Sequence, residues 1–398
     1  MTREEPAARN RKNVPERCPV TVLWDDRFLE YEFGHGHPFT EKSRKLAVDL
    51  LECHGFFERP SHRREGSFEP ATHEVLKRFH EEEYLDRVGR ASSSPRHTIL
   101  DTGDTPSFPG CFEASARIAA GTLRGIELLR DAPETHLFQP GGGLHHAHPD
   151  AASGFCIFND VALAISTALK VGGFKRVAYL DIDVHHGDGV MYGFYRDGRV
   201  LDIDFHQDGR TLFPGTGSLS EVGQGDGAQL KVNVPLPPGA GDREFLGAFH
   251  RVVPPMLREY KPELIVLQTG VDGHVGDPLA RLQYTSVAYQ GALEEVHELA
   301  HELCHGRLLE TGGGGYTPEN VARVLAQSGL LLAGEPAPDP AEPLPPTWRE
   351  KFAEVTGGPA PSRWGSGPTP IFVAHVAPVM EDTLRQLGHA LGREFPAT

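Results

Sequence analysis

The pattern of hydrophobic and polar positions changes about a third of the way along the chain. Apolar residues recur at helical spacing within 40–55, 73–91 and 111–130, and residues 21–24 read as a short strand. Beyond these segments, short apolar runs alternate with amphipathic ones. Strands are expected at 135–140, 176–184, 199–205, 230–236, 263–272 and within 306–316, and helices at 158–171, 242–260, 286–303 and 318–331.

This alternation predicts the fold class. Strands that are apolar on both faces and separated by helices indicate a largely parallel sheet with helices on both sides. No repeat of fixed period is present, and the composition is even up to about residue 332. We therefore expect an α/β protein in which a single three-layer domain, residues 20–332, surrounds a mostly parallel central sheet.

The two ends of the chain differ from this domain. A flexible polar segment is expected at 1–19, and a proline- and glycine-rich extension at 333–398. Within the extension, residues 334–346 and 357–370 read as extended wrapping segments. Residues 371–395 read as a terminal helix that packs on the domain or on a partner.

Composition and charge restrict the classes of ligand and compartment. With 39 basic against 55 acidic residues the net charge is -16, and no basic run offsets it, so direct nucleic-acid binding is not expected. The five cysteines are odd in number and form no CxxC pair, which argues against a disulfide framework and against a thiolate zinc site. The start is charged and no apolar run approaches the ~20 residues that span a bilayer. A cytoplasmic protein without membrane association is expected.

The stretch "YLDIDVHHGDGV", residues 179–190, places ionisable groups inside an apparent buried strand. Side chains two residues apart share a face of a strand, so Asp181, Asp183 and His185 lie together while Ile182 and Val184 face the other way. Burying such groups is costly unless they hydrogen-bond to one another or hold a cation. A divalent metal is one reading, and a helix-capping aspartate beside satisfied core histidines is the other.

A third metal ligand is available from another strand. Asp272 lies at the carboxyl end of the strand expected at 263–272, before a glycine-rich turn. Ligands in open α/β sheets bind at the carboxyl ends of the strands. Asp183, His185 and Asp272 would leave coordination positions open, as catalytic metals require.

Two glycine-rich loops add candidate groups. In "PGGGLHHAHPDAASGFC" three glycines precede His145 and His146, a pair that Asp181 and Asp188 could orient for proton transfer. "TGGGGYTPEN" delivers Tyr316 before a helix. No Gly-Lys-Ser/Thr follows, so it is no phosphate loop. It is either a flexible linker or a means of bringing a phenol donor to a developing oxyanion.

Together these motifs resemble the metal-dependent histone deacetylase family, in particular its bacterial branch of acetoin-utilisation and acetylpolyamine deacetylase proteins. The resemblance runs from about residue 31 to 331, which implies an arginase/deacetylase-like fold. It rests on five blocks in one order: "GGGLHHAHPDAASGFCIFND", "DIDVHHGDG", "FPGTGS", "GVDGHVGDPLARL" and "GGGGY".

The resemblance implies a role for each matching residue. Asp183, His185 and Asp272 would bind one catalytic zinc or iron(II) ion. His145 and His146 would form the general acid/base pair with Asp181 and Asp188, and Tyr316 would polarise the scissile carbonyl. Further implied residues are Gly154, Phe155, Phe213 and Leu279 in the acyl-lysine channel, Asp104 at its rim, Arg44 near its foot, and Asp181, Asp183, His185 and Asp204 at a structural potassium site. Residues 207–211 depart from the family pattern, which affects the register of Phe213.

The implied function is a metal-dependent amidohydrolase that converts N-acetyl-lysine in proteins to lysine and acetate. An acetylated polyamine is the alternative substrate, and a homo-oligomer is possible. An arginase-type ureohydrolase would need a second metal, but Gly187 and His274 stand where its further carboxylates would be. A non-catalytic protein that binds acetylated ligands would usually have lost a metal ligand or the tyrosine, and neither loss is present.

Overall fold

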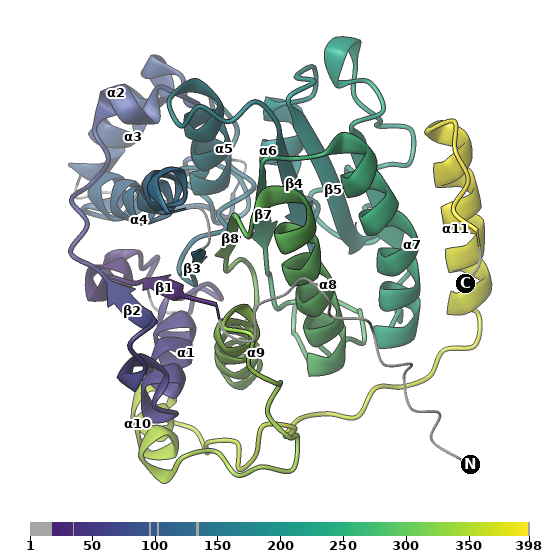
Figure 1. The fold of residues 1–398 in the computed structure, drawn as a ribbon. Coiled ribbons are helices and arrows are strands. Elements are labelled where there is room, and N and C mark those ends of the chain that lie inside the picture. The colour runs from purple at the N-terminus through teal and green to yellow at the C-terminus, as the bar shows by residue number, and fades with distance from the viewer. Residues whose placement is uncertain (1–17, 35, 95–96, 102, 133–134, 397–398) are drawn as a thin grey trace.

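The computed structural model describes residues 18–34, 36–94, 97–101, 103–132 and 135–396. Apart from Cys18 and Pro19, the flexible segment expected at 1–19 lies outside the described residues. Eight strands form one sheet in the order β2-β1-β3-β8-β7-β4-β5-β6, and every neighbouring pair is parallel (Figure 1). The strands are β1 Val20–Leu23, β2 His62–Glu65, β3 His136–Gln139, β4 Val177–Asp181, β5 Val200–Gln207, β6 Lys231–Leu236, β7 Leu264–Gln268 and β8 Leu308–Thr311.

Helices cover both faces of the sheet, so the expected three-layer architecture is confirmed. One layer contains α4, Cys111–Asp131, against β1, β3 and β8, and α5, Asp160–Lys170, against β4 and β7. The other layer is a row of four helices in mutual contact. These are α7 Asp242–Tyr260, α8 Ser286–Cys304, α9 Pro318–Leu332 and α1 Lys42–Cys53. Because both faces are covered, the central strands are buried along their whole length.

The first third of the chain departs from expectation in two places. The single helix expected at 73–91 is two, α2 His73–Leu76 and α3 Glu82–Ser92. Between them the buried His80 accepts the Asn159 backbone N–H at 3.0 Å, and the Glu81 N–H donates to the Pro149 carbonyl at 2.8 Å. These contacts with a distant loop interrupt the helix. β2 was also not expected, because its sequence HRRE carries the charges typical of an edge strand.

Four short elements complete the body of the protein. They are α6 Asp188–Gly193 and the 3₁₀ turns η1 Asp26–Glu30, η2 Phe56–Glu58 and η3 Gly225–Gly227. α6 directly follows the polar stretch after β4, and contacts α5. Asp188, its first residue, is therefore held at a fixed position relative to that stretch.

The C-terminal extension contains one helix more than expected. α10, Pro346–Thr356, lies on α1, where the buried Trp348 indole donates to the Leu46 carbonyl at 2.8 Å. The terminal helix α11 covers only Val376–Ala390 and lies beside α7 and the edge strand β6 (Figure 1). None of the helices in the described part of the chain combines the length and apolarity that crossing a membrane requires.

Candidate active site

The three predicted ligands of the catalytic metal meet at the carboxyl ends of two adjacent strands. Asp183 and His185 follow β4, and Asp272 follows β7, the neighbour of β4 in the sheet. The His185 Nδ1 lies 3.0 Å from Asp272 Oδ2 and 3.2 Å from Asp183 Oδ1. One ligand atom from each residue lies within 4.8 Å of the others, and all three side chains are buried.

The chemistry of this group fits a divalent ion. One imidazole nitrogen cannot satisfy two carboxylates, since it carries at most one proton. Burial and the neighbouring Asp183 raise the pKa of Asp272 to about 6, because both disfavour its ionised form. Two carboxylates and one imidazole are a ligand set that zinc and iron(II) accept in catalytic sites.

The remaining carboxylate oxygens are held by the protein. Asp183 Oδ2 accepts hydrogen bonds from the Gln268 amide at 2.9 Å and from the Gly314 backbone at 2.7 Å. Asp272 Oδ1 accepts the Val184 N–H at 2.9 Å. A Cβ atom at Gly314 would collide with the Asp272 carboxylate, so this approach of the backbone requires glycine.

The predicted histidine pair lies beside this group, and its two Nε2 atoms are 3.1 Å apart. The His145 Nδ1 lies 2.8 Å from Asp181 Oδ2, and the His146 Nδ1 lies 2.7 Å from Asp188 Oδ1. Burial lowers the pKa of His145, but the negative charges of Asp181 and Asp183 together have the larger effect. The pKa of His145 is raised to about 9. Burial and the adjacent His145 lower the pKa of His146 to about 4.

The loop that carries the pair is fixed by residues from α5. The buried Asp160 carboxylate accepts the Gly143 and Leu144 N–H groups, the latter at 2.8 Å. The Asn159 amide donates to the His145 carbonyl at 2.8 Å. Gly143 has φ +93° and its Cα faces the Gly312 carbonyl so closely that no side chain would fit. The two glycine-rich loops of the sequence therefore pack against each other.

Tyr316 lies in the loop between β8 and α9, where its backbone N–H donates to Asp277 Oδ2 at 2.9 Å. Its half-buried ring meets the His185 ring edge-on at 6.4 Å between centroids. Burial, Asp272 and Asp183 raise its pKa well above the usual value, so the phenol keeps its proton. Arg44, buried beneath this loop, donates to the Gly313 carbonyl.

The aromatic residues expected along the channel flank the same point. The Phe213 ring is 5.2 Å from the His146 ring, and the Phe155 ring is 6.0 Å from that of Tyr316. Phe213 is 41% exposed, so this wall opens to solvent. Gly154, with φ +51°, leaves room for His146 and Phe213, because a Cβ there would lie 2.9 Å from Phe213 Cε1.

The predicted rim residues are connected to this wall. The Thr105 hydroxyl accepts the Phe155 N–H at 3.0 Å and donates to Asp104 Oδ1 at 3.1 Å. Burial and the neighbouring Asp101 raise the pKa of Asp104 to about 6. Leu279 is 37% exposed, and its N–H donates to Asp277, the carboxylate that also holds Tyr316.

The atypical loop after β5 forms a closed turn. The Gln207 side-chain amide donates to Thr211 Oγ1 at 3.0 Å, and its carbonyl accepts the Arg281 N–H at 2.8 Å. The loop therefore joins the Phe213 side of the channel to the Leu279 side.

One of the residues expected at the potassium site, Asp204, has an unsatisfied carboxylate oxygen. Asp204 lies opposite Asp181 on β5, and its Oδ2 accepts the Gly187 N–H at 2.7 Å. Its Oδ1 is buried and has no hydrogen-bond partner among the described residues. Burial, Asp181 and Asp202 hold the pKa of Asp204 well above its usual value. A cation beside these carboxylates would relieve that repulsion.

Three residues of the site were not predicted from the sequence. The Tyr179 hydroxyl donates to Asp181 at 2.5 Å, Gln268 holds Asp183, and Asp277 holds Tyr316. Tyr179 precedes Asp181 by two residues on the same strand face, and Gln268 is in register with Asp181 across β4 and β7. For Tyr179 and Gln268, a polar residue inside an otherwise apolar strand was the available signal, whereas Asp277 lies in the loop after β7.

A second metal of the arginase type has no ligands here. The His274 Nδ1 lies 3.0 Å from the Val275 carbonyl, and its ring is parallel to Tyr289. Gly187, the other position in question, has no side chain. At this end of the sheet, the described residues form a single group with metal-ligand geometry.

Comparison with known proteins agrees with this geometry. Residues 37–330 match the model of the histone deacetylase domain. The chain is 34% identical to the acetoin utilization protein AcuC of Bacillus subtilis over 86% of this chain and 88% of the relative, and 33% identical to AcuC of Staphylococcus xylosus over 86% and 89%. Among solved structures it is similar to the HDA15 HD domain, with a TM-score of 0.70 and 28% identity over 79% of this chain and 92% of that one.

Proposed function

Since the chain belongs to the histone deacetylase family and is one of its amidohydrolases, we propose that it removes acetyl groups from N-acetyl-lysine in proteins and releases acetate. One observation carries the proposal. The two carboxylates and the imidazole of the metal group, the histidine pair and a protonated tyrosine converge at the carboxyl ends of β4, β7 and β8.

One zinc or iron(II) ion would be held by Asp183, His185 and Asp272. When bound, such an ion would polarise the acetyl carbonyl and would lower the pKa of a water molecule from about 15.7 toward about 7. Gln268 and the Gly314 backbone keep the Asp183 carboxylate turned toward the site.

The histidine pair moves the protons. His145 and His146 face one another through their Nε2 atoms, while Asp181 and Asp188 hold both Nδ1 atoms from behind. In this orientation the pair accepts a proton from the attacking water and returns one to the lysine amine as the amide C–N bond breaks.

Tyr316 stabilises the charge that forms on the acetyl oxygen. Because its pKa is raised, the phenol stays protonated and donates a hydrogen bond to that oxygen. Asp277 fixes its backbone, and Arg44 fixes the glycine loop before it.

The channel residues bind and orient the substrate. Phe155 and Phe213 would enclose the aliphatic part of the acetyl-lysine side chain, and Gly154 and Leu279 would complete its wall. Asp104 at the rim would accept hydrogen bonds from the substrate backbone. A structural potassium ion beside Asp181, Asp183, His185 and Asp204 would offset the repulsion among the buried carboxylates.

Protein acetyl-lysine is the first substrate to test, because the acetoin utilization proteins to which the chain is similar form the branch from which this substrate was inferred. We propose a cytoplasmic location, which the absence of disulfides among the five cysteines supports. An acetylated polyamine is the alternative substrate. The charge of -16 favours any cationic ligand and does not separate the two.

The decisive measurement is acetate release from an acetyl-lysine peptide and from an acetylpolyamine. Zinc- and iron-loaded protein would be compared with metal-stripped protein. Metal-dependent release is expected, with higher kcat/KM for the peptide. Replacing Tyr316 by Phe removes one oxyanion donor and should lower kcat by about 10²- to 10³-fold with unchanged metal content.

Tyr260→Phe is the matched control, because Tyr260 lies at the end of α7 and its hydroxyl bonds the Gly198 carbonyl. It should leave kcat unchanged. A higher kcat/KM for the acetylpolyamine than for the peptide would show that the acetylated polyamine is the preferred substrate. No release from either substrate by metal-loaded protein would favour a non-catalytic role in binding acetylated ligands.

A further inference from the structure

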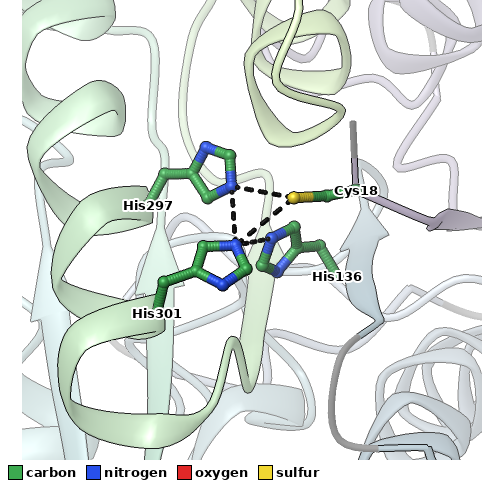
Figure 2. Close-up of side chains that lie close together, drawn as sticks. All are labelled: Cys18, His136, His297 and His301. Atoms are coloured by element: carbon green, nitrogen blue, oxygen red, sulfur yellow. Dashed lines mark hydrogen bonds between the residues drawn. The ribbon is translucent and has the colours of Figure 1, made fainter. Parts of the chain in front are cut away.

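A second cluster of metal-ligating side chains lies away from the deacetylase site and shares no residue with it. It contains Cys18, His136, His297 and His301, which Figure 2 shows pointing toward one another. Cys18 precedes β1, His136 is the first residue of β3, and the two other histidines stand one turn apart on α8. Four ligand atoms from three parts of the chain thus meet within 4.8 Å.

The His301 Nε2 atom is at the centre of the cluster. It lies 3.1 Å from His136 Nε2, 3.1 Å from His297 Nε2 and 3.3 Å from Cys18 Sγ. The Cys18 sulfur is also 3.5 Å from His297 Nε2. All four side chains therefore turn their donor atoms to a common point.

Hydrogen bonding within the cluster does not account for this convergence. A neutral imidazole nitrogen carries either one proton or one lone pair, so His301 Nε2 can satisfy one of its three neighbours. Charged histidines would repel each other in a site where Cys18 is 1%, His136 0% and His297 6% exposed. A cation that accepts all the lone pairs removes the conflict.

The spacing matches a tetrahedral zinc site. With zinc–nitrogen distances of about 2.0 Å and a zinc–sulfur distance of about 2.3 Å, neighbouring ligand atoms stand about 3.3 to 3.6 Å apart. Four of the six separations between the donor atoms, 3.1 to 3.5 Å, lie close to that range, and the other two are within 4.8 Å. We propose that Cys18, His136, His297 and His301 bind a second, structural zinc ion.

The surroundings are those of a structural rather than a catalytic site. Four protein ligands leave no open position for water or substrate. The cluster lies at the amino ends of β1 and β3, whereas ligands that react in α/β sheets bind at the carboxyl ends. Gly306, with φ +81°, packs against the rings, since a Cβ there would lie 3.0 Å from the Cε1 of His301 and 3.6 Å from that of His136.

Such an ion would fasten the start of the domain. The Cys18 N–H donates to the Ala333 carbonyl after α9, and the His136 N–H donates to the Pro19 carbonyl at 3.0 Å. Zinc would add a direct link from this junction to α8. It would therefore join the amino end of the sheet to the helical layer.

The test compares metal content and spectra of the wild-type protein with those of two cluster variants and one control variant. Wild type is expected to contain two zinc ions per chain, and Cys18→Ser to contain one. Cys53→Ser is the matched control, because Cys53 lies at the end of α1 outside the cluster, and it should keep both ions. In protein loaded with cobalt(II), a thiolate-to-metal charge-transfer band should appear in wild type and Cys53→Ser and be absent from Cys18→Ser.

The cobalt band separates this proposal from the proposed function, because the group of Asp183, His185 and Asp272 contains no sulfur. A His301→Ala variant should also lose one zinc ion and unfold at a lower temperature. If the variants fail to fold, X-ray absorption of zinc-loaded wild type still reports whether sulfur is bound. A single ion per chain without sulfur ligation, or two ions in both cluster variants, would overturn the proposal.

Discussion

Asp188 bonds two imidazoles at once, whereas Asp181 bonds one. Its Oδ1 lies 2.7 Å from His146 Nδ1, and its Oδ2 lies 3.1 Å from the partly exposed His148. These histidines hold the pKa of Asp188 well below its usual range despite burial. Asp188 therefore stays ionised and fixes the tautomer and direction of His146.

Asp188→Asn tests this role, because the amide keeps the shape of the side chain and removes its charge. We expect kcat to fall by at least about 10²-fold, as His146 loses its partner for proton transfer. Metal content should be unchanged. Steady-state kinetics and metal analysis provide the measurement. Asp197→Asn, which removes a surface partner of Arg199, is the control and should have wild-type activity. An effect on KM alone would contradict the assignment.

At the scale of elements, β8 has a buried acid in the middle of the sheet. Glu310 lies on this strand between β3 and β7, and the hydroxyls of Thr269 and Ser328 face it. Burial raises the pKa of Glu310 to about 8. Between about pH 4.5 and about pH 8, Glu310 is therefore protonated in the folded protein and ionised in the unfolded chain.

Replacement of Glu310 by Gln should change how stability depends on pH. Because the pKa of Glu310 is higher in the folded state, its bound proton stabilises that state at low pH. This contribution to stability is lost as the pH rises from about 4.5 to about 8. We expect equal melting temperatures for wild type and variant below about pH 4.5 and a higher one for the variant above about pH 8. Thermal unfolding across pH measures the difference. A constant difference between the two curves would show that Glu310 titrates normally.

At the scale of the whole molecule, the C-terminal extension contacts helices far apart in the chain. α10 lies on α1, and α11 lies beside α7 and β6. Between these helices, Arg323 donates to the Trp364 carbonyl, and Pro368 lies close to Gly276 in the loop after Asp272. We propose that residues 20–332 form the catalytic domain and that residues 333–398 support it from outside.

Truncation after residue 334 should test this division. It removes the buried Trp348, Phe352 and Trp364, each of which contributes roughly 1.5–3 kcal/mol by burial. We expect a loss of at least about 4 kcal/mol in the free energy of unfolding, measured by denaturant titration. Acetate release should persist, because every proposed reacting residue is retained.

Truncation after residue 370 is the comparison, since it removes α11 and keeps α10. It should cost less stability and leave kcat unchanged. Loss of all activity in the protein truncated after residue 334 only, with the fold intact, would show that the extension is part of the active site.

The sequence by itself determined most of the elements and the main chemical groups. Short apolar runs separated by amphipathic segments predicted the strands from β3 onward, because strands buried on both faces read as continuous apolar runs. The two-residue period of the strand expected at 176–184 placed Asp183 and His185 on one face; β4 ends at Asp181, so both lie in the segment after it, where they still meet. Neighbouring motifs such as His145 with His146 could be read from the chain, because each lies within one loop.

Only the tertiary structure decided which distant residues meet. The break between α2 and α3 depends on the hydrogen bond between His80 and the Asn159 backbone. The orientation of the Asp183 carboxylate depends on the hydrogen bond from the Gln268 amide. Cysteine spacing argued against a thiolate zinc site, yet Cys18 lies among histidines 118 to 283 positions away. Local periodicity reports the direction of a side chain within its own element. Which side chains then share a point in space follows from the order of strands in the sheet and the packing of helices on it.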